Sequence, residues 1–155
     1  MSNNLIRARA GIECINFLSN FYSDNLIVLR NHQEIFDGSY RDIDLFLSAN
    51  ESKLYDILKN KSIFDDNHQL INYIQRKNFL QLKIFSKISM EVFIIDIWDS
   101  LEWKGIPYFI SQSANKKLEF CSEKGINFYP EKEQLLLAIC KCLTQTGTIK
   151  KKYID

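Results

Sequence analysis

The sequence predicts a single α+β domain that spans residues 1–155. Three runs in the middle of the chain, at 68–76, 78–86 and 91–99, alternate apolar and polar residues, which is typical of strands that bury one face. Both ends of the chain instead carry apolar residues at helical spacing. The chain has only five glycines and two prolines, so no flexible junction divides a length that suits one hydrophobic core.

The N-terminal segment predicts a helix followed by a strand. Ile12, Ile15 and Leu18 recur at helical spacing, which indicates an amphipathic helix from about residue 6 to 21. The run LIVLR at 26–30 is short, apolar and bounded by polar residues. This composition is typical of a buried strand.

A loop, a second strand and a second helix come next. Residues 31–41 are polar and predict a loop, in which the pair Gly38-Ser39 marks a turn. Residues 42–47 predict a strand, and the segment 51–60 predicts a helix because Ser48 or Asn50 can cap its first turn.

The rest of the chain predicts an antiparallel meander and a final helix. The three alternating runs follow one another with short connections, and 108–111 predicts one more short strand. Residues 113–124 are polar and helix-compatible. The last helix is expected at 131–147, since Pro130 is tolerated at a helix start and Gly147 at a helix end.

Composition narrows the classes of partner and the compartment. The net charge is only +1, so the chain has no strong field to attract nucleic acid, and nucleic acid is not an expected partner. No signal peptide and no apolar stretch of about 20 residues is present, which predicts a cytoplasmic protein without a membrane partner. Free thiols are therefore expected at all four cysteines: Cys14, Cys121, Cys140 and Cys142.

Acidic residues interrupt two of the predicted strands. Asp42 and Asp44 share one face of the first strand, and Asp96 takes the corresponding place in a strand whose other face is aliphatic. If the two strands are neighbours, the three carboxylates converge. Like charges held that close are costly unless a cation neutralises them, so the pattern predicts a Mg²⁺ or Mn²⁺ site.

Structural alternatives exist for each charged residue. Asp42 could simply begin a strand, and Asp44 could be a buried acid that pairs with Arg30 or Arg41, as buried charges usually require a partner. Lys83 shares a strand face with Gln81, and that face could be exposed to solvent alone.

The ordered motifs IVLRN, HQEIFDGSY, RDIDLFL and FIIDIW resemble those of the nucleotidyltransferase superfamily, whose fold is that of the DNA polymerase β palm. Asp42 and Asp44 match the paired acids of its Asp-x-Asp strand, and Asp96 matches the third acid. The superfamily carries a Gly-Ser turn after the first strand, where this chain has Arg30-Asn31. The segment Trp103-Lys104-Gly105 is similar to a Trp-basic-Gly sequence in a subgroup associated with glycan biosynthesis.

The resemblance implies a nucleotidyltransferase-like mixed sheet with flanking helices and transfer of a nucleoside monophosphate from an NTP to an unidentified acceptor. It implies that Asp42, Asp44 and Asp96 hold two divalent ions about 4 Å apart. Phosphate contacts would then fall to the polar residues nearby: Arg30, Asn31, Arg41 and Lys83. His32 and Tyr40, in the predicted loop, are weaker candidates for nucleotide contact.

Two other functional classes stay open at this point. A small nucleotidyltransferase could act as the antitoxin of a toxin–antitoxin pair, with a protein partner. A degenerate domain could bind nucleotide or protein without turnover. Release of pyrophosphate would distinguish an enzyme from the second class.

Overall fold

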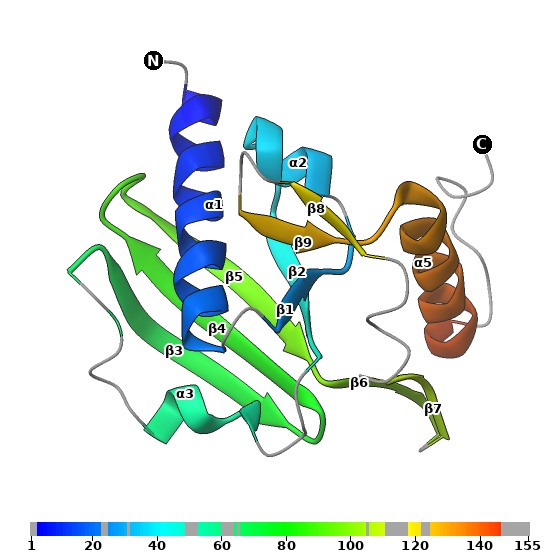
Figure 1. The fold of residues 1–155 in the computed structure, drawn as a ribbon. Coiled ribbons are helices and arrows are strands. Elements are labelled where there is room, and N and C mark those ends of the chain that lie inside the picture. Colours follow the sequence, from blue (N-terminus) through cyan, green and yellow to red (C-terminus); the bar gives the residue numbers. More distant parts are fainter. Residues whose placement is uncertain are drawn as a thin grey trace.

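The structure, a computed structural model, describes residues 3–22, 25–30, 32–48, 53–59, 64, 66–104, 106–110, 118–121 and 125–146 (Figure 1). Its elements in chain order are α1 (Asn3–Phe21), β1 (Leu26–Val28), α2 (His32–Asp37), β2 (Asp42–Leu47), α3 (Asp56–Lys59), β3 (His68–Arg76), β4 (Phe79–Ser86), β5 (Glu91–Trp98), β6 (Ser100–Trp103), β7 (Ile106–Ile110), β8 (Glu119–Cys121), β9 (Ile126–Phe128) and α5 (Glu131–Thr146). This mixture of a large sheet and helices confirms the predicted α+β class.

Seven strands form one mixed sheet in the order β3-β4-β5-β2-β1-β9-β8, while β6 and β7 pair separately. The strands β3, β4 and β5 make the antiparallel meander that the alternating runs predict. β2 lies parallel to β5 and antiparallel to β1. The meander therefore returns the chain to β2, so that residues 52 positions apart in sequence, such as Asp44 and Asp96, become neighbours.

One face of the sheet is packed against α1, which lies across it in Figure 1. Alternate side chains of the central strands point into this core, as period-two burial requires. The core includes Ile43 and Leu45 of β2, Ile95 of β5, and Cys14 and Leu18 of α1, all essentially inaccessible to solvent. This burial fixes which face the remaining side chains of β2 and β5 must occupy.

The opposite face carries a smaller apolar cluster over β1 and β2. Ile27, Phe46 and Tyr129 are buried there, and Trp98 and Leu137 pack against them. Leu137 belongs to α5, so this helix covers one part of the second face. The acids lie on this face as well.

Several predicted elements are confirmed, with small changes of boundary. The first helix starts at Asn3, the first strand ends at Val28, and the last helix begins at Glu131, directly after Pro130. Gly147, the expected end of that helix, lies outside the described residues.

The segment predicted as a loop at 31–41 contains a helix, α2, and this part of the prediction is wrong. His32 and Ile35 are buried in it, and the helix packs against α1. Six helical residues offer too few turns for a periodic pattern, so tertiary packing rather than local propensity determines this element.

Two further expectations need correction. The helix-compatible segment 113–124 contains a strand, β8, which pairs with β9, and the other residues of the segment, apart from Leu118, lie outside the described part. Of the predicted helix at 51–60, only 56–59 is α-helical among the residues described there.

Two findings concern the helices and the cysteines. No helix in the described part of the chain is long and apolar enough to span a membrane. All four cysteines are free thiols, as the sequence predicts.

Candidate metal centre

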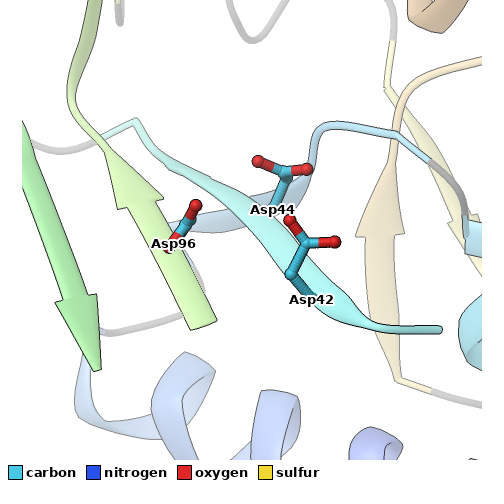
Figure 2. A group of neighbouring side chains, drawn as sticks. All are labelled: Asp42, Asp44 and Asp96. Atoms are coloured by element: carbon cyan, nitrogen blue, oxygen red, sulfur yellow. The ribbon is translucent and has the colours of Figure 1, made fainter. Parts of the chain in front are cut away.

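Asp42, Asp44 and Asp96 meet on one face of the sheet, as Figure 2 shows. In the parallel register of β2 with β5, Asp44 lies opposite Asp96, and Asp42 lies opposite Ile94. One carboxylate oxygen from each residue lies within 4.8 Å of the other two. The predicted convergence of the three acids is therefore present.

The aliphatic residues between the acids produce this arrangement. Ile43 and Leu45 bury completely in the α1 core, and strand alternation then directs Asp42 and Asp44 to the other face. Burial differs along the cluster: Asp44 is only 3% exposed, Asp96 is half-buried and Asp42 is exposed. The site is thus closed at Asp44 and open at Asp42.

Arg30 pairs with the most buried of the three acids. Its Nε lies 2.6 Å from Oδ2 of Asp44, in the geometry of a charge-assisted hydrogen bond. Arg30 comes directly after Leu29, whose backbone N–H donates to the carbonyl of Asp44 at 3.0 Å. This ion pair is the structural alternative that the sequence left open for Asp44.

Gln81 orients the third acid. Its side-chain Nε2 donates to Oδ1 of Asp96 at 2.8 Å, from the position directly opposite on β4. Such a bond restricts rotation of the carboxylate and fixes the direction in which it presents its oxygens. Sequence reasoning did not identify this role, although alternation along β4 places Gln81 on the same face as Lys83.

The donor set fits a divalent cation. Carboxylate oxygens on one octahedral Mg²⁺ lie about 3 to 4 Å from each other, so small rotations would bring the three residues into position. Three carboxylates converge here, and the Arg30 guanidinium pairs with one of them. Like charges held this close favour binding of a cation. Asp42, Asp44 and Asp96 are therefore the residues that could hold it.

The other predicted site residues lie at different distances from the acids. Lys83 on β4 lies opposite Ile94 on β5, and Ile94 lies opposite Asp42 on β2. Lys83 is therefore level with Asp42 and two strands away from it. Arg41 is exposed and directly precedes β2. Asn31 lies outside the described residues.

His32 and Tyr40 are packing residues. The ring of His32 stacks on Phe128 with centroids 4.3 Å apart, and its Nδ1 contacts the side chain of Gln134. Tyr40 is 1% exposed and donates its hydroxyl to the carbonyl of Arg7 at 2.9 Å. These contacts and the burial of both side chains argue against the expectation that either residue contacts nucleotide.

A narrow cavity lies behind Asp44, between the sheet and α5. It measures about 20 Å³, is lined by Arg30, Asp44, Trp98 and Ala138 among others, and has room for about one water molecule. A nucleotide cannot enter it. Ligand access to the acids is therefore from the open side, where Asp42 is exposed.

Comparison of the chain with family models, with curated proteins and with solved structures found no match.

Proposed function

We propose that this protein is a metal-dependent nucleotidyltransferase that transfers a nucleoside monophosphate from an NTP to an acceptor hydroxyl or amine. The observation that carries the proposal is the trio of carboxylates on adjacent parallel strands, with oxygens within 4.8 Å of one another. The order of the acids along the chain, with two on one strand and a third on a later neighbouring strand, is the pattern that resembles the superfamily.

Each acid has a distinct role in this proposal. Asp42 and Asp44 would hold the divalent ions, and Asp96 would also hold the ion on the acceptor side and take the proton of the acceptor group. The metal would supply charge stabilisation for the phosphates and lower the pKa of the acceptor hydroxyl. Gln81 keeps Asp96 in the orientation that this role needs.

Arg30 takes the place of the phosphate-binding turn. In the superfamily that turn uses glycine and serine, whereas here a guanidinium projects from the end of β1 to within 2.6 Å of Asp44. A guanidinium binds phosphate with two parallel hydrogen bonds, so Arg30 can contact the triphosphate once it leaves the carboxylate.

A second candidate function is nucleotide or protein binding without turnover. The Arg30–Asp44 ion pair favours it, because a buried acid that is already paired needs no metal for its stability. Pyrophosphate release with metal and NTP would exclude this function, and nucleotide binding without release would support it. Co-purification of a toxin with the chain would instead favour an antitoxin.

Thermal unfolding of the wild type and of Asp44→Asn tests the proposal. Both proteins are measured alone, with Mn²⁺ or Mg²⁺, and with the metal plus each of the four NTPs. We expect the wild type to gain about 2.7 kcal/mol when the ligand is present at a hundred times its Kd, and Asp44→Asn to gain nothing. Glu119→Gln, which removes an exposed acid from β8, is the matched control and should respond like the wild type.

The stability of the unliganded mutant is equally informative. Asparagine still accepts a hydrogen bond from Arg30 and relieves repulsion among the acids, so we expect Asp44→Asn to lose no more than about 2 kcal/mol. A loss of about 3 to 5 kcal/mol, together with a wild type that ignores metal and NTP, would show that Asp44 has a structural role only.

A further inference from the structure

The outer edge of β3 has the features of a strand-pairing surface. β3 is the first strand of the seven-stranded sheet, and within the described residues no strand pairs with its other side (Figure 1). It is nine residues long, and the six from Ile71 to Arg76 are all exposed. The strand at the opposite edge, β8, has only three residues.

Exposed apolar side chains gather on this edge. Ile71 is 55% exposed, Tyr73 43% and Ile74 41%, in a strand that contains no proline and only one formal charge, Arg76. The backbone N–H of Tyr73 donates to Oδ1 of Asn72, a local bond that a neighbouring strand could replace. Long apolar edges of this kind pair with further strands unless the fold protects them.

A hollow adjoins the same edge. The register of β3 with β4 shifts between Leu70 and Asn72, which leaves Ile71 as an extra residue in the strand. Beside this bulge lies a depression of about 510 Å³, lined by residues 68–73 together with Phe64, Asp66 and Lys87. Its size and its position at the rim suit a large side chain that arrives from outside the chain.

Charges of opposite sign lie at the two ends of the edge. Asp66 precedes β3, Arg76 ends it and Lys77 follows, and all three are exposed. If a second copy pairs antiparallel across a two-fold axis near Asn72, the acidic end of each strand lies beside the basic end of the other. The same axis places Tyr73 of each copy opposite Ile71 of the other, at the rim of the hollow.

We infer that this protein forms a homodimer through β3, in which the two sheets join into one continuous sheet. The two-fold axis is perpendicular to the sheet, so the acid clusters of both copies lie on the same face. Five strand intervals separate the two Asp96 residues, which is about 24 Å measured across the strands. The inference rests on the edge of the sheet alone and does not depend on metal binding.

Charge reversal tests the antiparallel arrangement. Asp66→Lys makes both ends of β3 basic, and the double variant Arg76→Asp/Lys77→Asp makes both ends acidic, so each variant alone repels itself at two places. We expect each to weaken dimerisation about tenfold at low ionic strength, measured by sedimentation velocity over a series of concentrations. A mixture of the two variants pairs opposite charges at both ends, and we expect it to form a heterodimer with wild-type affinity.

Substitution of the apolar edge provides the second measurement. Ile74→Lys should dissociate the dimer, whereas Phe120→Lys, at an equally apolar and 62% exposed position on β8, should leave it intact. Circular dichroism establishes that each variant is folded. Three results would overturn the inference: a wild type that sediments as a monomer up to about 100 µM, a dimer lost only with Phe120→Lys, or a mixture of the charge variants that stays dissociated.

Discussion

Arg30 acts as an internal counter-cation for the acid cluster. Its Nε lies 2.6 Å from Asp44, the acid with the least access to water. A divalent ion bound to Asp44 would lie a few ångströms from this guanidinium, and the two like charges would repel. A triphosphate relieves the repulsion because it supplies negative charge for both cations. Metal and nucleotide should therefore bind cooperatively.

Replacing Arg30 by glutamine should reverse this coupling. We expect Arg30→Gln to bind Mn²⁺ alone about tenfold more tightly than the wild type, because the competing positive charge is gone. The nucleotide should then raise the affinity for Mn²⁺ by a smaller factor than it does in the wild type. Isothermal titration calorimetry with Mn²⁺, with and without a nonhydrolysable NTP, measures both quantities.

Arg41→Gln is the control for this experiment, since Arg41 is an exposed arginine next to the same strand. If both variants change Mn²⁺ binding equally, the effect is one of net charge and not of the Arg30–Asp44 pair. Unchanged Mn²⁺ binding in Arg30→Gln would contradict a role for Arg30 at the metal centre.

The residue scale also shows what the sequence can predict of a site. Asp42, Asp44 and Asp96 could be predicted because each interrupts an aliphatic alternation, which is a local pattern. The contact of Gln81 with Asp96 could not, since it depends on the register of β4 against β5. Register is set by turns and packing across the sheet, and a polar residue on a strand carries no mark of its partner.

At the scale of elements, the packing of α2 against α1 positions the segment between β1 and β2. α2 lies between β1 and β2 in the chain; Arg30 comes two residues after the end of β1, and Asp44 belongs to β2. Gly38 follows α2 directly and has a φ of 79°, which is unfavourable for any residue with a side chain. A Cβ at this position would meet the backbone oxygen of Asn4 at 2.0 Å, so α1 and α2 approach as closely as glycine allows.

Gly38→Ala should therefore be strongly destabilising. We expect a loss of about 3 kcal/mol or more in the free energy of unfolding, from backbone strain and from the separation of two helices. Gly125→Ala is the matched control: its φ is 65°, but its nearest contact is 3.5 Å away on the side chain of Asn16. Its free energy of unfolding should fall by about 1 to 2 kcal/mol, from backbone strain alone. Urea denaturation of both variants measures the difference, and equal losses would contradict the close approach of α1 and α2.

The elements differ in how well the sequence predicts them, for a physical reason. β4 and β5 each present eight alternating residues, and their strand character is visible from the pattern alone. α2 and β8 have six and three residues, and each is stabilised by a neighbour that is distant in the chain or by a partner strand. Short elements lack a period, so tertiary contacts decide their structure.

At the scale of the whole molecule, buried tyrosines form hydrogen bonds between segments that are distant in the chain. Tyr22 is 2% exposed and donates its hydroxyl to the carbonyl of Leu54 at 2.8 Å, which ties α1 to the segment before α3. Burial raises the pKa of the Tyr22 phenol well above its usual value, and the nearby Asp56 raises it further. Burial raises the pKa of Tyr40 and of Tyr129 in the same direction.

Stability should consequently fall in alkaline solution. A phenol whose pKa is higher in the folded state stabilises the fold fully below the unfolded pKa of about 10. That contribution is lost as the pH rises above this value toward the folded pKa. We expect Tyr22→Phe to lower the free energy of unfolding by about 1 kcal/mol at neutral pH. Between about pH 9 and 11, the free energy of unfolding of this variant should decrease less steeply than that of the wild type. Equal slopes for the wild type and Tyr22→Phe would contradict the burial of Tyr22.

The central claim is that the three acids bind a divalent metal together with a nucleotide. Anomalous diffraction from crystals grown with Mn²⁺ and a nonhydrolysable NTP tests it most directly. We predict a manganese peak about 2.2 Å from carboxylate oxygens of Asp42, Asp44 and Asp96, with the triphosphate beside it and Arg30 turned from Asp44 toward phosphate. The claim would be contradicted if crystals grown with both ligands showed no manganese at these carboxylates and kept the Arg30–Asp44 pair intact.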